Sequence, residues 1–230
     1  MGRFKVGCPI QADMDRLLVG FDFDGTLSES EMTVLLGTRA GVADQMRSIT
    51  EAAMNDEIEY AESLRRRVGL LEGLPEAEVH DAFDAVTLRP GAADTIGTLR
   101  SHDVHVAILT GGFRRGVTAA LERAGVTVDT LIANELTLRD GELTGEVTGP
   151  LIEGTKDDAL RSLADDLSVA MADSIAVGDG ANDLPMLEVS GLAVGFRPKP
   201  AVEPACDVVV ESMAELDAVL ARELAERRID

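Results

Sequence analysis

Short apolar runs separated by helical segments are the feature that most constrains how this chain can fold. Residues 17–23, 104–110 and 174–179 read LLVGFDF, VHVAILT and SIAVGD, and each has the length of one buried strand. Segments with helical periodicity lie between them, and two further short runs, LAVGF and VVV, follow. Buried strands that alternate with helices predict an α/β fold, a Rossmann-like parallel sheet core with right-handed crossovers and helices on both faces.

The segment between the first two predicted strands is too long for one crossover. Its pattern is helical from residue 29 to about 85, with Asp56-Glu57 able to start one helix, Gly73 able to end it and Pro75 suited to the first turn of the next. We therefore expect an inserted helical cap. The predicted parts are an N-terminal tail (1–16), an α/β core (17–30 and 88–230) and a helical cap (31–87).

The remaining elements follow from the same periodicities. The sequence LTLRDGELTGEV, centred on Asp140-Gly141, predicts a β-hairpin after a short strand at 130–134. The predicted helices of the core span residues 91–100, 114–124, 155–167, 183–189 and 213–227.

Charge excludes some classes of partner. The formal net charge is −21, and Lys5, Lys156 and Lys199 are the only lysines among the 21 basic residues. Such a surface repels nucleic acid and acidic membranes. Two interpretations stay open: adaptation to high salt, in which ions screen the self-repulsion, or an ordinary acidic protein from a genome that favours arginine.

Composition also bears on the compartment. Hydrophobic residues make up 45% of the chain, which is enough for a full core, and no run of about 18 apolar residues predicts a membrane span. The first residues lack the apolar stretch of a signal peptide. Two cysteines, Cys8 and Cys206, are too few for a disulfide framework and are expected to be free thiols. These features predict a cytoplasmic protein.

The first acidic strand end is Phe21-Asp22-Phe23-Asp24-Gly25. Alternate residues of a strand share a face, so Asp22 and Asp24 lie on one side, at the carboxyl end where open α/β sheets bind ligands. Two carboxylates this close repel each other unless one is protonated or a cation such as Mg²⁺ lies between them. The alternative is a polar turn, in which Asp is common.

A second acidic strand end repeats this arrangement. Asp179 ends a predicted strand between two glycines, and Asp183 follows one helical turn later, so both carboxylates can point at one ion. Asp179 or Asn182 could instead cap the next helix. Capping explains one acid here but not two, and two acidic strand ends in one sheet can share a cation.

Two further segments could bind an anion. Thr110-Gly111-Gly112 is predicted to end the second strand and open a helix, where a hydroxyl and bare backbone N–H groups form an anion site. Lys156 is predicted to start a helix, where a cation opposes the helix dipole unless it serves a bound anion. The alternatives are a plain glycine turn and a solvated surface lysine.

Together these segments resemble the haloacid dehalogenase-like superfamily of aspartyl-phosphate hydrolases. DFDGTL, a hydroxyl at the second strand end, a lysine and GDGAND occur in the order of that superfamily. The segment GVADQMRSITEAAMNDEIEYAESLRRRVGLLEGLP is similar to the helical cap of the phosphoserine phosphatases, as are the TGGF turn, the hairpin and VGDGANDLPML. The resemblance covers about Leu17 to Leu220.

The resemblance implies a magnesium-dependent phosphomonoester hydrolase. Asp22 would attack phosphorus, Asp24 would act as acid and then base, and Lys156 would complete the catalytic set. Mg²⁺ would be held by Asp22, the Asp24 backbone carbonyl and Asp179, with support from Asp183. Residues implied to contact phosphate are Thr110, Gly111, Lys156 and Asn182.

The resemblance also implies a substrate, L-phosphoserine. Glu31 matches the residue that pairs with the substrate ammonium, and Arg67 the one that binds its carboxylate. Met54 and Tyr60 match apolar cap positions that exclude water. Alternatives to the substrate role are a solvated basic face for Arg67 and simple core packing for Met54 and Tyr60.

Other readings of the whole chain stay open. Gly25 and Thr110 stand where phosphoserine phosphatases more often have serine. The chain could act on another small phosphomonoester, such as phosphohomoserine or a sugar phosphate, or transfer the phosphoryl group to an alcohol. A non-catalytic protein would have little reason to keep closely placed carboxylates. A monomer or homodimer with a small-molecule substrate is expected.

Overall fold

The structure of the protein is a computed structural model, and it describes residues 17–54 and 57–227. Seven strands form a sheet in the order β4-β3-β2-β1-β5-β6-β7, and all neighbours are parallel except β3 and β4. The α/β prediction is confirmed. The strands are β1 (Leu18–Phe21), β2 (His105–Phe113), β3 (Thr130–Arg139), β4 (Glu142–Thr148), β5 (Ser174–Gly178), β6 (Leu192–Phe196) and β7 (Val208–Val210).

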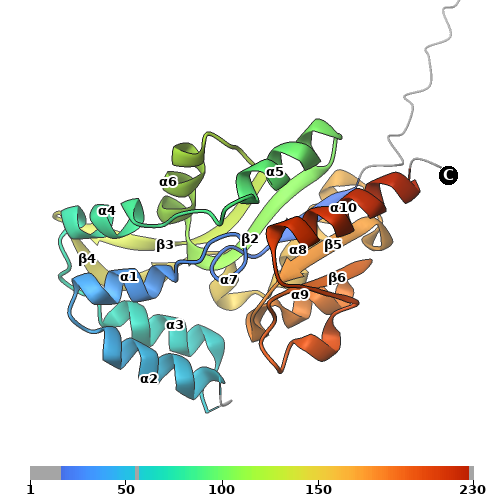
Figure 1. Cartoon of the computed structure of the whole chain (residues 1–230). Helices are drawn as coiled ribbons and strands as arrows, with labels where there is room; N and C mark the ends of the chain where they lie inside the picture. Colours follow the sequence, from blue (N-terminus) through green and yellow to red (C-terminus); the bar gives the residue numbers. More distant parts are fainter. Residues whose placement is uncertain (1–16, 55–56, 228–230) are drawn as a thin grey trace, which may run out of the picture.

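Helices cover both faces of the sheet (Figure 1). Alternate residues of β1 point to opposite sides, so Val19 belongs to one buried cluster and Leu18 to another. The first cluster includes residues of α5 (Ala92–Ser101), α6 (Arg114–Ala124) and α10 (Met213–Arg227). The second includes residues of α8 (Lys156–Leu167) and α9 (Leu184–Val189). No helix in the described part of the chain has the length and apolar character needed to cross a membrane.

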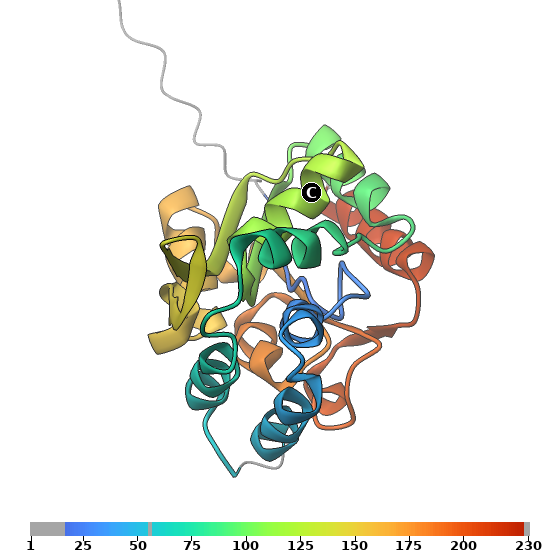
Figure 2. The ribbon, with the colours of Figure 1, turned by 90° about the vertical axis from the view of Figure 1, so that its left-hand side faces the viewer.

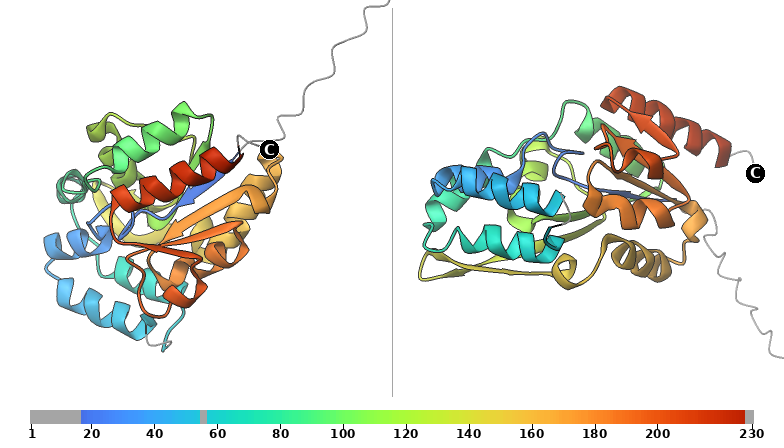
Figure 3. Two further views of the ribbon diagram at one scale, coloured as in Figure 1. Left: turned by 45° about the vertical axis from the view of Figure 1, so that its right-hand side comes forward. Right: turned by 90° about the horizontal axis from the view of Figure 1, so that it is seen from below.

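Four helices lie between β1 and α5 and group beside the sheet (Figures 2 and 3). They are α1 (Met32–Arg39), α2 (Ala43–Met54), α3 (Tyr60–Gly69) and α4 (Glu76–Asp84). The predicted bounds of one helix were wrong. Its start was predicted at Asp56-Glu57, and of these two residues Asp56 lies outside the described part of the chain. Helix α3 begins at Tyr60 and ends at Gly69. The helix ends before Gly73 because the chain turns from Leu70 to Gly73, where φ is +79°.

The predicted hairpin is confirmed and joins the sheet to this helical group. Asp140 and Gly141 both adopt positive φ, +52° and +84°, as a tight two-residue hairpin turn requires. Leu143 on β4 accepts a hydrogen bond from the Gly73 N–H at 2.8 Å and donates one to the Leu74 carbonyl at 2.9 Å. The sheet edge is therefore hydrogen-bonded to the loop between α3 and α4.

The two chain segments that connect the sheet with the inserted helices are held together. The Ser28 hydroxyl donates to the Thr87 carbonyl at 2.9 Å. The Arg89 guanidinium donates to the carbonyls of Thr26 and Gly25 at 2.9 and 2.8 Å. The outgoing and returning segments thus form one hydrogen-bonded unit.

The remaining sequence expectations concern the thiols. Cys206 is a free, half-buried cysteine, as predicted. Cys8 lies in the predicted tail of residues 1–16, which is outside the described residues.

Candidate active site

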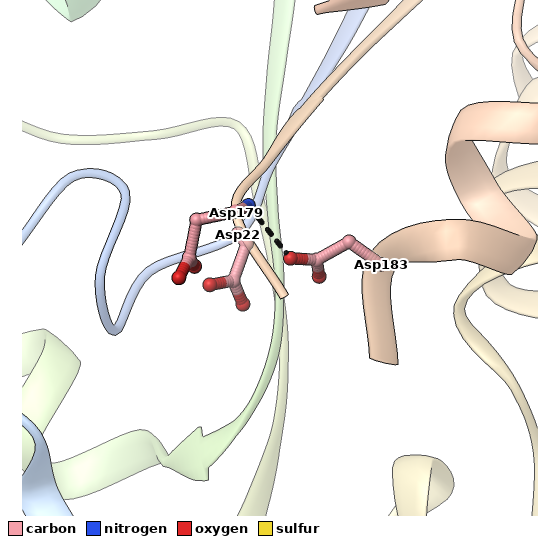
Figure 4. A group of neighbouring side chains, drawn as sticks. All are labelled: Asp22, Asp179 and Asp183. Atoms are coloured by element: carbon pink, nitrogen blue, oxygen red, sulfur yellow. Dashed lines mark hydrogen bonds between the residues drawn. The ribbon is translucent and has the colours of Figure 1, made fainter. Parts of the chain in front are cut away.

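Three carboxylates converge at the carboxyl end of the central strands. Asp22 directly follows β1 and Asp179 directly follows β5, and these parallel strands pair through Phe21 and Val177. One carboxylate oxygen each from Asp22, Asp179 and Asp183 lies within 4.8 Å of the other two (Figure 4). Asp22 is only 3% exposed. Strand pairing therefore brings the two predicted acidic segments to one place.

Asp183 is fixed by its neighbours. Its Oδ2 accepts hydrogen bonds from the backbone N–H groups of Asp179 and Gly180 at 3.0 and 2.9 Å. A Cβ added to Gly178 would lie 2.6 Å from the Asp183 carboxylate, so a larger residue there would displace it. Asp183 therefore anchors the loop that presents Asp179, while its Oδ1 faces Lys156.

Lys156 links the acids. This first residue of α8 is 4% exposed, and its Nζ lies 2.5 Å from both Asp22 Oδ1 and Asp183 Oδ1. Burial alone would lower the pKa of Lys156, but Asp183 and Asp22 raise it above the ordinary value. The lysine stays charged and offsets part of the negative charge of the group.

Lys199 is a second cation that sequence reasoning missed. Its Nζ lies 3.3 Å from Asp179 Oδ2. It follows β6, the strand next to β5, and is one of three lysines in the whole chain. Its position after a strand and the rarity of lysine in this chain could have identified it from the sequence. Ligands of parallel sheets bind at the carboxyl ends of the strands, and a lysine placed there is a candidate for the site.

The electrostatics favour binding of a further cation. Burial, followed by repulsion from Asp183, raises the pKa of Asp22 to about 8, although Lys156 opposes the rise. Burial raises the pKa of Asp179 and Lys199 lowers it, and the net result is a pKa above the ordinary value. Closely spaced oxygen donors with raised pKa values fit a hard divalent ion such as Mg²⁺, which would favour their charged forms.

The Asp24 side chain stands apart from these three carboxylates. Burial, then Glu31 and Asp22, raise its pKa well above the ordinary value. Its Oδ1 is buried and has no hydrogen-bond partner within residues 17–54 and 57–227. A Cβ on Gly112 would approach its Oδ2 to 3.0 Å, so the carboxyl faces β2. A buried carboxyl that holds a proton and that is close enough to Asp22 to be affected by its charge is a candidate proton donor for this site.

The predicted end of the second strand at Thr110 was wrong, whereas the helix predicted at 114–124 is confirmed. Strand β2 continues to Phe113, and α6 begins at Arg114. Pairing with β3 shifts between Thr110–Ala133 and Phe113–Asn134, so the two glycines form an irregular bulge within the sheet. The strand persists because β3 supplies backbone partners on both sides of the bulge.

Asn134 supports this bulge and was not predicted. Its Nδ2 donates to the Gly111 carbonyl at 3.0 Å. The Thr110 hydroxyl accepts a hydrogen bond from the Gly112 N–H at 2.9 Å, which leaves its own proton free to donate to a ligand. The segment keeps the predicted hydroxyl and bare backbone at the strand end, in a bulge instead of a helix N-terminus.

The inserted helices contribute a buried guanidinium. Arg67 on α3 is 9% exposed and donates to Thr33 Oγ1 at 3.3 Å and to the Ser63 carbonyl at 3.4 Å. No carboxylate of the described residues lies within ion-pair distance of it. A buried charge without a counter-ion is costly, so this position suits a ligand carboxylate or phosphate.

The other predicted residues differ in how far the structure describes them. Glu31 directly precedes α1 and is exposed as a residue, while burial of its carboxyl raises the pKa and Lys199 opposes the rise. Asn182 is half-buried beside Gly180. Met54 is the last residue of α2, and its side chain lies outside the described part.

Comparison with known proteins gives consistent results. The profile of the haloacid dehalogenase-like hydrolase family matches residues 19–188. A phosphoserine phosphatase of Halobacterium salinarum is 53% identical over 203 residues, which are 88% of this chain and 96% of that protein. One from Methanocaldococcus jannaschii is 37% identical over 84% of this chain and 92% of its own.

Solved structures agree with the sequence comparison. A phospho-aspartyl intermediate analogue of phosphoserine phosphatase matches with a TM-score of 0.80 and 36% identity, over 86% of this chain and 94% of that one. A substrate-bound phosphoserine phosphatase complex matches with a TM-score of 0.80, 35% identity and the same coverage.

Proposed function

We propose, from the premise that this chain belongs to the haloacid dehalogenase-like hydrolase family, that it hydrolyses L-phosphoserine to L-serine and phosphate, the step that would supply serine for biosynthesis. The observation that carries the proposal is the contact of the buried Asp22 with Lys156 within the group formed by Asp179 and Asp183. The relatives named above are phosphoserine phosphatases, which supports the choice of substrate.

The proposed chemistry has two displacements at phosphorus. In the first, an Asp22 oxygen bonds to phosphorus as the P–O bond to serine breaks, and Asp24 gives its proton to the departing serine oxygen. In the second, a water oxygen bonds to phosphorus, Asp24 takes the water proton, and the bond from Asp22 to phosphorus breaks. The raised pKa of Asp24 suits these roles, because burial, followed by Glu31 and Asp22, makes this carboxyl hold a proton more readily than an ordinary one.

Mg²⁺ is the cation we propose for the carboxylate group. Asp22, the backbone carbonyl of Asp24 and Asp179 would hold it, and Asp183 would support Asp179 through the loop. When bound, it supplies positive charge that lowers the repulsion between a carboxylate nucleophile and a phosphate dianion.

The transferring phosphoryl group needs donors on its other oxygens. Thr110 Oγ1, the Gly111 N–H and Lys156 Nζ would supply them from β2 and α8, with Asn182 at the edge. These groups are held by strand pairing or burial, so little reorganisation is required when charge develops.

The inserted helices would recognise the amino acid and act as a cap of residues 31–87. The Arg67 guanidinium would bind the substrate carboxylate, Glu31 its ammonium, and Met54 would exclude water. Opening and closing would occur at the segments joined by Ser28 and Arg89.

A phosphate-release assay over a panel of phosphorylated metabolites tests the function. We expect phosphoserine to have the highest kcat/KM, and Asp22→Asn to abolish turnover while circular dichroism stays unchanged. Comparable kcat/KM on phosphohomoserine or a neutral sugar phosphate would contradict the substrate. Exchange of labelled serine into phosphoserine faster than hydrolysis would instead identify a phosphotransferase.

The physiological setting is also a proposal. The net charge of −21 with three lysines supports an enzyme adapted to high salt, and the cytoplasmic location and a monomeric or homodimeric state stay predictions.

A further inference from the structure

The hydroxyl of Tyr60 lies against the phosphate-binding bulge. Tyr60 is the first residue of α3, in the inserted helices, while Gly111 belongs to β2 of the sheet. A Cβ added to Gly111 would overlap the Tyr60 hydroxyl, so the missing side chain of the glycine makes the space in which the phenol sits. The hydroxyl is therefore a contact between the inserted helices and the sheet.

The surroundings of this hydroxyl are strongly charged. Lys156 and Arg67 favour the phenolate form and Asp22 and Asp24 oppose it, so all four act on the phenol electrostatically. Burial outweighs them and raises the pKa of Tyr60 to about 12. The phenol consequently stays protonated, and it is a hydrogen-bond donor at any physiological pH.

The Tyr60 hydroxyl makes no hydrogen bond with another residue of the described ranges, 17–54 and 57–227. Apolar packing accounts for the ring, but it does not account for an oxygen directed at Gly111. The phenol proton is therefore available to a ligand oxygen that enters this space.

We propose that the Tyr60 hydroxyl donates a hydrogen bond to a phosphoryl oxygen of the substrate, as a phosphate-binding residue contributed by the inserted helices. The inference rests on the proposed function for its ligand, a phosphate monoester at Asp22. The other proposed donors are Thr110 and Gly111 on β2 and Lys156 on α8, and Tyr60 adds one from the inserted helices. The inserted helices would then sense the phosphoryl group as well as the amino acid.

The test compares Tyr60→Phe, which removes one oxygen, with Tyr60→Leu, which also removes the ring. We expect Tyr60→Phe to raise the inhibition constant of inorganic phosphate about tenfold, as loss of a hydrogen bond to a charged group does. The inhibition constant of L-serine should change by less than about twofold, because L-serine has no phosphoryl oxygen to lose. If Tyr60→Phe matches the wild type and only Tyr60→Leu is impaired, the residue is an apolar wall and the proposal is wrong.

A second measurement needs neither a variant nor turnover. The chain has one tyrosine and no tryptophan, so its intrinsic emission comes from Tyr60 alone. Titration of the Mg²⁺-loaded protein with inorganic phosphate should change this emission, with a midpoint equal to the inhibition constant. L-Serine should leave the emission nearly unchanged.

The two proposals fail separately. Emission that responds to phosphate in a protein that does not hydrolyse phosphoserine would keep the phosphate contact and overturn the function. Hydrolysis of phosphoserine with an unresponsive emission, and with an unchanged phosphate inhibition constant in Tyr60→Phe, would overturn the contact alone.

Discussion

Lys199 holds Asp179 by two contacts: its ammonium lies 3.3 Å from the Asp179 carboxylate, and its backbone N–H donates to the Asp179 carbonyl at 2.9 Å. The ammonium side chain is about half exposed, so the ion pair is screened by solvent. Asp179 is also a proposed ligand of the cation. The ammonium and the metal ion therefore act on the same carboxylate.

Lys199→Gln should lower the stability of the metal-free protein and increase the stabilisation that Mg²⁺ provides. In EDTA we expect the free energy of unfolding to fall by about 0.5–1 kcal/mol, because less positive charge offsets the carboxylates. The stabilisation gained on adding Mg²⁺ should increase, because a competing cation is gone. Urea unfolding with and without Mg²⁺ measures both. Arg222→Gln, an exposed residue paired with Glu223, is the control, and an unchanged Mg²⁺ response in Lys199→Gln would contradict the prediction.

Arg67→Ala should raise the KM for phosphoserine at least tenfold, the loss of about 1.4 kcal/mol or more for a charged hydrogen bond, and should affect p-nitrophenyl phosphate little. Only the first substrate has a carboxylate to lose. Arg66→Ala is the matched control, because Arg66 is exposed and pairs with Glu62 on the same helix. Equal losses on both substrates would mean that Arg67 serves the fold and not the carboxylate.

Arg89→Ala should destabilise the protein by about 2 kcal/mol, because two part-buried carbonyls lose a charged donor. Arg89→Lys should recover less than half of this loss, since an ammonium cannot reproduce the planar fork and its position 5.1 Å above the Phe196 ring. Urea denaturation gives the values. Arg39→Ala, which removes exposed ion pairs to Glu78 and Asp81, should cost far less. Similar losses for both variants would mean that the hydrogen bonds from Arg89 to the Thr26 and Gly25 carbonyls contribute no more than exposed ion pairs.

Tyrosinate absorbance should rise at a higher pH in the folded protein than in the urea-unfolded chain. The pKa of Tyr60 is raised to about 12, from an ordinary value of 10.0, so the folded state binds this proton more tightly. Its contribution to stability is complete below pH 10 and is lost as the pH rises toward 12. The lone tyrosine makes the signal specific. Coincident titrations of folded and unfolded protein would exclude a buried phenol.

Molar KCl should raise the melting temperature. The formal net charge of −21 repels itself, and salt shortens the range of that repulsion to a few ångströms. A scanning-calorimetry series in KCl, with sucrose at matched water activity as the control, separates screening from general stabilisation. A melting temperature that stays flat or falls as KCl increases would favour the ordinary acidic protein.

Local patterns in the sequence were enough to predict the sheet, its parallel direction and the two acidic strand ends. Apolar runs indicate buried strands. The strands that begin at Leu18 and Ser174 are parallel neighbours, so their carboxyl ends lie at the same edge of the sheet. Asp22 and Asp179 were therefore recognisable as neighbours before any coordinates. The hairpin at Asp140-Gly141 was equally local, because its turn depends on the backbone preferences of two residues.

Contacts between distant segments were decided only by the tertiary structure. Three contacts join segments that lie far apart in the sequence, and no periodic pattern predicts them. They are the ion pair of Lys199 with Asp179, the hydrogen bond from Arg89 to the Gly25 carbonyl, and the packing of the Tyr60 hydroxyl against Gly111. The bulge after Thr110 belongs here too, since pairing with β3 kept the two glycines in the sheet where the local sequence predicted the end of the strand. Sequence patterns record which side chains leave water, whereas packing in three dimensions determines which of them meet.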